Sequence, residues 1–317
     1  MDLSFLTKAG IPVIQNALLA KYTTFQLGGP CAALIECNDA QQISFAVSTL
    51  RANDQPFVLM GFGSNILASD QGIDRVILRY SSATPAITRH GNNIRVDAAT
   101  QIDALAEYAV NAGLAGLTTF SGIPGTVGGA IAGNAGAYGA QISDSLITLT
   151  VLDKNNSVSI IPRHAVKFAY RDSDIKHNGT IILSAEFTLL PGDKAGMSKQ
   201  RADIIRERES KHGRWQETPC AGSFFRNVEP TSQADRRQSA GGIIEQAGGK
   251  SLNVNGAHSY ARHANIITRD NGASALDVYD LTLAIQELVK KKTGIELIRE
   301  VRLLGTFNGI GDPVDFW

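Results

Sequence analysis

The sequence predicts an α+β fold, with one larger domain built around two glycine-rich turns and a smaller C-terminal domain. Three observations support this class. Helix and strand patterns follow one another in the first 115 residues, β-branched segments dominate residues 146–190, and helical patterns return after residue 197. A chain of 317 residues is long enough for two or three domains with cores of their own.

The first third of the chain predicts a helix and two strands around a turn. Asp39 stands at a capping position of a helix over residues 39–54, whose apolar residues recur on one face. The apolar strand at residues 56–60 leads directly into the turn GFGSN, and a second strand covers residues 74–80. A strand and a glycine turn therefore come together here.

The middle of the chain predicts a second helix and then a sheet. The helix covers residues 101–113, where Thr100 and Asp103 form a capping box at its start and Gly113 closes it. Three β-branched segments between residues 146 and 190 are separated by turn residues, which favours a mainly antiparallel sheet.

The last third predicts three helices and a final strand. A charged helix covers residues 198–213, a short one surrounds residues 241–249, and a long one runs from Ala275 to Thr293 with Gly294 at its end. Residues 295–305 predict the strand, on which Glu300 faces away from the apolar side because strand side chains alternate.

Composition and charge exclude several function classes. Thirty basic residues balance thirty acidic ones, so no overall field attracts nucleic acid or an anionic membrane. The first residues lack the pattern of a secretory signal, and we expect a cytoplasmic protein, a monomer. The three cysteines form no CxxC pair and the six histidines no HExxH motif, so neither a disulfide framework nor a metal site is expected.

The segment SGIPGTVGGAIAGNAGAYG at residues 121–139 holds seven glycines and no charged residue. Fixing glycine in a fold costs conformational entropy, so such a segment indicates left-handed turns or the close approach of a ligand to the main chain. Inward-pointing amides in a turn bind anions. The first turn, GFGSN, lacks the third glycine of a dinucleotide fingerprint, since Ile66 stands at that position. The two turns together predict a site for a large phosphorylated cofactor.

Six motifs, in order along residues 23–305, resemble the UDP-N-acetylenolpyruvoylglucosamine reductase family, also called UDP-N-acetylmuramate dehydrogenases. They are TTFQLGGP, GFGSNIL, the long glycine segment, FAYRDS, AGSFFRN and REVRLLG. The resemblance implies an FAD-binding domain of the vanillyl-alcohol oxidase type in two subdomains, residues 1–80 and 81–194, followed by a substrate domain over residues 195–317. Residues 191–198, PGDKAGMS, are the expected boundary.

On this resemblance the bare main chain binds FAD without a covalent bond. The cofactor residues it implies are Gly61, Phe62, Gly63, Ser64 and Asn65 in the first turn, and Ile123, Pro124, Gly125, Thr126, Gly128, Gly129, Asn134, Gly136 and Ala137 in the second. NADPH is the implied electron donor.

The implied reaction reduces the enolpyruvyl ether of a UDP-sugar to UDP-N-acetylmuramate, a precursor of peptidoglycan. Flavin N5 delivers a hydride, and the charge that develops on the substrate needs preorganised donors and a proton. Matched to the family motifs, Arg171 stabilises the intermediate, Ser223 donates the proton and Glu300 assists at the carboxylate. From the residues alone, a structural or solvent-exposed position explains each of the three better than a catalytic role does.

Tyr170, Arg226 and Asn227 are the substrate residues that the motifs imply. The chain departs from the family pattern before Ser223, where it has KHGRWQETPC, and at Arg226, where lysine is usual. These departures concern the contacts to the uridine diphosphate more than the redox chemistry. Nothing between Ser223 and Ile243 resembles a tyrosine-bearing lid insertion, so the chain resembles the shorter subclass.

Two other functions remain open from the sequence. An FAD oxidase of an alcohol or a sugar lactone could share the fold, although no histidine between His90 and His164 could carry a covalent flavin. A nucleotide-binding module without catalysis is the third hypothesis, against which the joint presence of Arg171, Ser223 and Glu300 argues.

Overall fold

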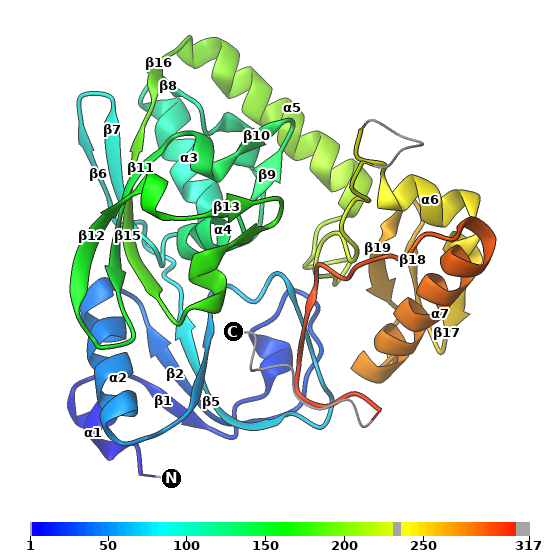
Figure 1. Ribbon diagram of the computed structural model, residues 1–317, viewed down its shortest axis with the longest axis horizontal. Helices are drawn as coiled ribbons and strands as arrows, with labels where there is room; N and C mark the ends of the chain where they lie inside the picture. Colours follow the sequence, from blue (N-terminus) through cyan, green and yellow to red (C-terminus); the bar gives the residue numbers. More distant parts are fainter. Residues whose placement is uncertain (1, 231–235, 309–317) are drawn as a thin grey trace.

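The computed structural model describes residues 2–230 and 236–308. Two sheets and their helices form one side of the molecule, a smaller α+β unit forms the other, and helix α5 runs between them (Figure 1). The α-helices are α1 (Ser4–Lys8), α2 (Ala40–Ala52), α3 (Ile102–Asn111), α4 (Val127–Ala132), α5 (Lys194–His212), α6 (Ala240–Gln246) and α7 (Ala275–Thr293). The 3-10 helices are η1 (Leu19–Lys21), η2 (Thr118–Phe120), η3 (Ile142–Asp144), η4 (Arg163–Ala165), η5 (Asp174–His177) and η6 (Gly249–Ser251).

The first sheet is mixed and supports the first glycine turn. Its strands are, in spatial order, β1 (Val13–Gln15), β2 (Cys31–Cys37), β5 (Ile73–Tyr80) and β3 (Phe57–Met60). β2 and β3 both pair in parallel with β5, and β3 ends at the residue before Gly61. Asp39 caps α2 through hydrogen bonds from the amides of Gln41 and Gln42, and the predicted apolar face is buried, so the expected helix is confirmed.

The second sheet is antiparallel throughout. Its strands are, in spatial order, β12 (Val158–Pro162), β11 (Leu146–Leu152), β15 (Ile181–Thr188), β7 (Asn93–Asp97) and β6 (Ile87–His90). This confirms the antiparallel sheet expected from the β-branched segments. Both sheets and α2, α3 and α4 contribute to one hydrophobic core.

The C-terminal unit packs two helices on a small sheet. The sheet consists of β17 (Asn253–Val254), β18 (Ala257–Tyr260) and β19 (His263–Arg269). α7 has the predicted bounds, because Ser274 forms a capping box with Asp277 and Gly294 takes the left-handed conformation at its end. Phe25, Leu27 and Leu67 from the start of the chain join the core of this unit.

Four two-stranded pairs complete the described part of the chain. They are β4 (Ile66–Ala68) with β20 (Arg302–Leu304), β8 (Leu114–Ala115) with β16 (Leu190–Pro191), β9 (Gly136–Ala137) with β10 (Ala140–Gln141), and β13 (Phe168–Ala169) with β14 (Asp172–Ser173). The pairing of β20 with β4 is parallel and joins the last strand to the residues that directly follow the first glycine turn.

Two local predictions are wrong. The capping box at Thr100 does not form, because the Thr100 hydroxyl accepts a hydrogen bond from the Ala86 amide and Asp103 pairs with Arg201 on α5. The predicted strand over residues 295–305 is reduced to β20, and Glu300 precedes it. In both cases tertiary contacts replace the local ones. Thr100 and Asp103 bond partners outside the helix, and the Glu300 amide donates to Phe224 instead of a neighbouring strand. The domain boundaries at residues 80 and 194 remain predictions.

The two units also meet at a pair of histidines, and this contact predicts acid sensitivity. The ring of His212 at the end of α5 lies edge-on to His263 on β19, 5.4 Å between centroids. Burial, followed by the neighbouring His263, lowers the pKa of His212 to about 4. The folded state therefore stays unprotonated at His212 while the unfolded chain binds a proton below about pH 6.5.

We expect the free energy of unfolding to fall as the pH drops from about 6.5 toward about 4, with His212 contributing on the order of 1 kcal/mol. His212→Phe keeps a ring against His263 and removes the titration. Urea unfolding at pH 7.5 and pH 5 checks this: the variant should lose less stability than the parent between the two values. Equal losses in both proteins would contradict the assignment.

Candidate active site

The two glycine turns contact each other directly. A Cβ atom on Gly61 would lie 2.6 Å from the Thr126 hydroxyl, and one on Gly125 would lie 3.4 Å from the Ser64 hydroxyl. Thr126 in turn caps α4 by accepting a hydrogen bond from the Gly129 amide. The first and second turns thus form one continuous surface of main chain.

This surface carries a run of amide groups without protein partners. Within the described residues, the amides of residues 62–65, 125 and 126 donate no hydrogen bond to the protein. Successive inward-pointing amides in a turn bind anions such as a pyrophosphate. The donor set therefore fits a phosphorylated cofactor.

Some glycines serve the fold instead. Gly63 has a φ of +75°, and a Cβ there would lie 2.1 Å from the Tyr22 carbonyl oxygen, so the close packing of the chain alone requires glycine. Gly129 differs, since it is exposed and a Cβ there would meet nothing closer than the Thr126 hydroxyl at 3.3 Å. The packing of the protein leaves the absence of a side chain at Gly129 unexplained.

Arg171 and Glu300, distant in the sequence, form an ion pair at the edge of the second turn. Arg171 lies in the two-residue turn between β13 and β14 with a φ of +57°, and its Nε lies 3.2 Å from Glu300 Oε1. The contact is not a hydrogen bond, because the Nε–H does not point at the carboxylate and is buried without a partner. Gly136 lets the guanidinium approach, as a Cβ there would lie 3.1 Å from Arg171 Nη1.

Ser223 lies one residue from a backbone contact to Glu300. The Glu300 amide donates to the carbonyl of Phe224 at 2.8 Å, which places the two predicted catalytic segments side by side. The first glycine turn also contacts Glu300, because Asn65 Nδ2 donates to the Glu300 carbonyl at 3.1 Å. The structure thus brings the segments of Arg171, Ser223 and Glu300 together with the glycine turns.

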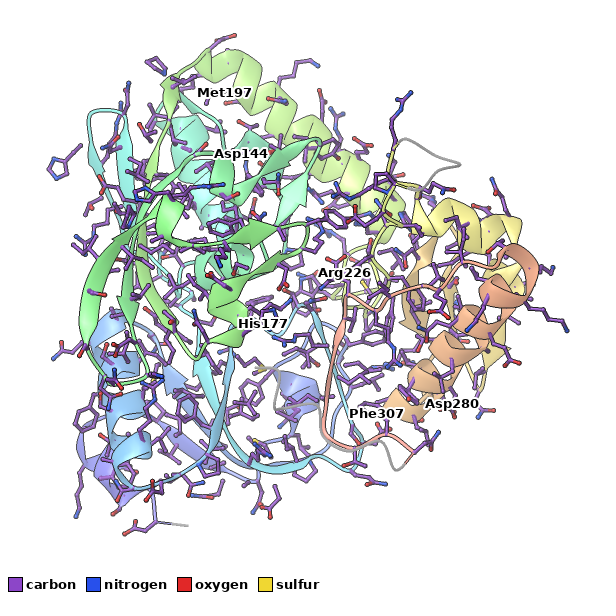
Figure 2. All side chains as sticks on the ribbon, in the orientation of Figure 1. Asp144, His177, Met197, Arg226, Asp280 and Phe307 are labelled. Atoms are coloured by element: carbon purple, nitrogen blue, oxygen red, sulfur yellow. The ribbon has the colours of Figure 1, made fainter. Side chains whose placement is uncertain are left out.

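Positive charge surrounds Glu300. Burial raises the pKa of Glu300, and the positive charges of Arg171, Arg226 and Lys176 oppose this with a smaller effect. Burial also lowers the pKa of Lys176, and that of Arg302 to about 10. Figure 2 shows Arg226 where the C-terminal unit faces the rest of the molecule.

The predicted substrate residues lie around this cluster. The Tyr170 ring has the Arg171 guanidinium 5.4 Å and the Arg237 guanidinium 4.0 Å from its centroid. The Arg226 amide donates to the Ile298 carbonyl at 2.9 Å, and its Nε is buried without a partner. Asn227 is engaged locally, since its Oδ1 accepts from the Ala240 amide at 3.1 Å.

Two predicted cofactor residues make contacts within the protein. The Asn134 side chain is buried and donates to Gln141 Oε1 and to the Ala169 carbonyl, which fixes the end of the second turn. Phe62 packs edge-on against Trp215, 5.9 Å between centroids, and both line a cavity of about 180 Å³ with Tyr22 and Arg79.

Sequence reasoning missed several charged residues of the site. Lys176 lies near Glu300 and Asp172, and Arg302 lies near Asp172. Arg302 stands inside the matched motif REVRLLG, which could have indicated it, whereas Lys176 stands outside the matched motifs. Arg208 on α5 donates to the Thr119 carbonyl at 3.1 Å, while its Nε is buried without a partner. A Cβ on Gly122 would lie 3.4 Å from Arg208 Cδ, so Arg208 reaches the second turn from outside the predicted FAD-binding domain.

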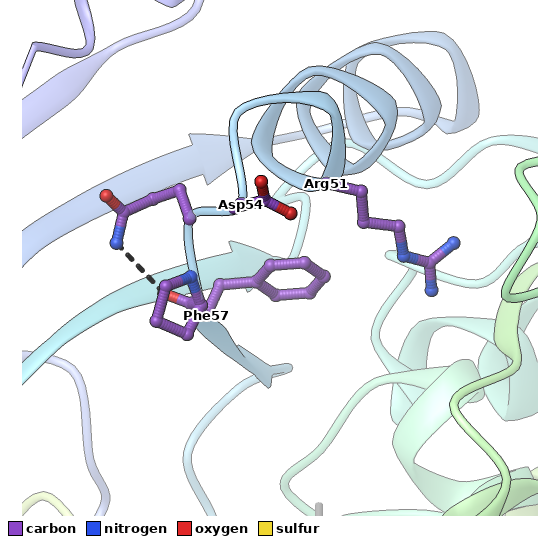
Figure 3. Close-up of a pocket in the computed structure, with 5 residues that line it drawn as sticks. Arg51, Asp54 and Phe57 are labelled. Atoms are coloured by element: carbon purple, nitrogen blue, oxygen red, sulfur yellow. Dashed lines mark hydrogen bonds between the residues drawn. The ribbon is translucent and has the colours of Figure 1, made fainter.

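A larger hollow lies away from these residues. Arg51, Asp54, Gln55, Pro56 and Phe57 line an open pocket of about 400 Å³ between the end of α2 and the start of β3 (Figure 3). It contains no predicted site residue. Among the described residues, no group of three or more His, Cys, Asp or Glu side chains could hold a metal ion, and no helix is long and apolar enough to cross a membrane.

Comparisons with known proteins identify the family. The model of the UDP-N-acetylenolpyruvoylglucosamine reductase C-terminal domain matches residues 213–304, and that of an FAD binding domain matches residues 31–160. The UDP-N-acetylenolpyruvoylglucosamine reductase of Carboxydothermus hydrogenoformans is 38% identical over 93% of this chain and 94% of its own. The chain belongs to this reductase family.

Two further relatives agree with this family. The Clostridium novyi reductase is 32% identical over 92% of this chain and 91% of its own. The crystal structure of the Thermus caldophilus reductase has a TM-score of 0.75 and 28% identity, and covers 92% of this chain and 98% of that protein. The predicted α+β fold, an FAD-binding domain followed by the C-terminal domain of this family, is confirmed.

Because Gly129 is exposed, replacing it with alanine tests directly whether FAD lies against α4. Replacing a helical glycine by alanine stabilises a helix by roughly 0.5–1 kcal/mol. The new methyl would crowd the Thr126 hydroxyl that caps α4, so the two effects offset and Gly129→Ala protein without FAD should be about as stable as the parent. If FAD lies against this residue, the extra methyl group should weaken FAD binding about tenfold or more. Titration of apoprotein with FAD, followed by flavin fluorescence, measures the change.

Gly133→Ala is the matched control, because Gly133 ends the same helix outside the predicted cofactor contacts. It should leave FAD affinity within about twofold of the parent. Unchanged affinity in Gly129→Ala would mean that the cofactor does not approach α4.

Proposed function

We propose that this chain is an NADPH-dependent flavin reductase that converts UDP-N-acetylglucosamine enolpyruvate to UDP-N-acetylmuramate in the synthesis of peptidoglycan precursors. One observation carries the proposal: the Arg171–Glu300 ion pair lies at the cofactor turns, with the Ser223 segment bonded to Glu300 through Phe224. Family membership supports this reaction and does not support the oxidase.

Bound FAD would supply the two-electron chemistry that carries a hydride from NADPH to the enolpyruvyl double bond. The amides of residues 62–65, 125 and 126 would hold its pyrophosphate, since they have no protein acceptor within the described chain. The protein then has to stabilise negative charge on the substrate carboxylate and deliver one proton to the carbon that bears the ether oxygen.

Arg171 would stabilise that charge. Its guanidinium has an Nε–H without a hydrogen-bond acceptor, and a planar fork suits a carboxylate. Arg226 supplies a second buried and unpartnered Nε–H nearby. Preorganised donors of this kind require no rearrangement as the charge develops.

Glu300 and Ser223 would complete the proton chemistry. Because burial raises its pKa, Glu300 keeps a proton at higher pH than an exposed glutamate does, and a protonated carboxyl donates a hydrogen bond to the substrate carboxylate. Ser223, one residue before the contact to Glu300, would give its hydroxyl proton to the carbon. The surrounding arginines and Lys176 favour an anionic ligand and hold the intermediate in place.

We also place the reaction in the cytoplasm, in keeping with three unpaired, buried cysteines, and expect a monomer that binds no nucleic acid and no membrane. Residues 1–80, 81–194 and 195–317 are the proposed domains. The subclass without a lid insertion remains a proposal, because residues 231–235 of the relevant segment lie outside the described residues.

The role of Ser223 predicts that its loss affects one half of the reaction. In Ser223→Ala, NADPH should reduce the flavin at nearly the parental rate, while reduction of the enolpyruvyl sugar slows by roughly 10²–10⁴, the range for a lost general acid. Stopped-flow absorbance of the flavin under anaerobic conditions resolves the two steps. An equal loss in both steps would show that Ser223 has a different role.

The raised pKa of Glu300 predicts the pH dependence of sugar reduction. The protonated carboxyl is present on the acidic side, so the rate should fall as the pH rises through this pKa. Glu300→Gln cannot titrate and should show a slower rate without that fall, when single-turnover rates are measured from pH 5 to pH 9. A variant that keeps the parental pH profile would assign the titration to another group.

A further inference from the structure

The Ser223 segment is held between two other parts of the chain. On one side Phe224 donates its amide hydrogen to the Asn265 carbonyl on β19 at 2.8 Å. On the other side the Phe224 carbonyl accepts from the Glu300 amide at 2.8 Å. The segment behaves as a short extra strand between β19 and the chain that leads into β20, both visible in Figure 1 as parts of the C-terminal unit and its connection.

The side chain of Asn265 adds a second attachment. Its Oδ1 accepts from the Phe225 amide at 2.9 Å, and its Nδ2 donates to the Phe225 carbonyl at 2.8 Å. Only 2% of Asn265 is exposed. A carboxamide offers a donor and an acceptor side by side, and here both are used on one residue of the Ser223 segment.

Asn265 is itself fixed in position. Its own amide donates to His263 Nδ1 at 3.2 Å, and β19 is paired with β18 on its other side. The sheet therefore holds Phe224 and Phe225 in place. Of these two residues, Phe224 follows Ser223 directly and accepts from the Glu300 amide. Catalytic groups must be held within a fraction of an ångström, since a displacement of about 1 Å can cost about 10² in rate.

We infer that Asn265 is a positioning residue for proton delivery, which acts by clamping Phe225 so that Ser223 and Glu300 face the same point of the substrate. This inference rests on the role proposed above for Ser223. It concerns sugar reduction alone, because no contact of Asn265 in the described chain reaches the glycine turns.

Asn265→Asp tests the clamp. The carboxylate keeps the size of the side chain and the acceptor for the Phe225 amide, but it loses the donor to the Phe225 carbonyl. In flavin-loaded protein, we expect sugar reduction to slow by about 10–10² and flavin reduction by NADPH to stay within about twofold. In a Ser223→Ala background, Asn265→Asp should cause almost no further loss, because the two changes remove the same function.

Thr268→Val is the matched control. Thr268 lies on the same strand, is buried, and donates to the Pro219 carbonyl at 3.1 Å, so it also tethers the chain before Ser223. This substitution should lower the thermal midpoint while leaving both half-reactions within about threefold. A general loss of tethering would slow sugar reduction in both variants alike and would overturn the specific role of Asn265.

The outcomes separate the two proposals. If Ser223→Ala reduces the sugar at the parental rate, the proposed role of Ser223 fails. If Ser223→Ala is slow but Asn265→Asp is not, or if their losses multiply, the clamp fails while the proposed function stands. Should Asn265→Asp not hold flavin, Asn265→Ala, which removes both hydrogen bonds to Phe225 without placing a charge in this buried position, replaces it. If neither variant holds flavin, Asn265 serves folding and the inference is wrong.

Discussion

The contact of the first glycine turn with both the second turn and Glu300 is the constraint on which the site depends. Gly61 lies against Thr126, and Asn65 bonds the Glu300 carbonyl with its side chain and the Arg302 amide with its main chain. One loop of five residues therefore fixes the second glycine turn relative to Glu300. A shift of this loop would move both at once.

The glycines of these turns serve two separate purposes. Gly63 permits the chain to pass the Tyr22 carbonyl, and Gly136 permits the Arg171 guanidinium to approach the main chain. Gly129 is exposed, and a Cβ there would meet nothing closer than the Thr126 hydroxyl at 3.3 Å. Close packing thus explains part of the glycine content and leaves Gly129 unexplained. The unpartnered amides include that of Gly63, whereas the Gly129 amide donates to the Thr126 hydroxyl.

Local signals in the sequence were sufficient for several elements. α7 has the predicted bounds because Ser274 and Gly294 are capping residues in their own sequence context. The final strand was predicted too long, since no local pattern shows that Phe224 takes the Glu300 amide. The Arg171–Glu300 pair and the clamp at Asn265 join residues far apart in the chain. Only the resemblance to the family pointed to Arg171 and Glu300, and no sequence signal pointed to Asn265.

The central claim is that main-chain amides without a protein acceptor in the two turns hold FAD, and amide hydrogen exchange tests it most directly. Apoprotein and FAD-loaded protein would be compared by mass spectrometry on peptides that cover residues 62–65 and 125–126. The account predicts that these amides, which have no acceptor in the protein, exchange at least about tenfold more slowly when FAD is bound. Unchanged exchange at both turns, with protection elsewhere, would contradict it.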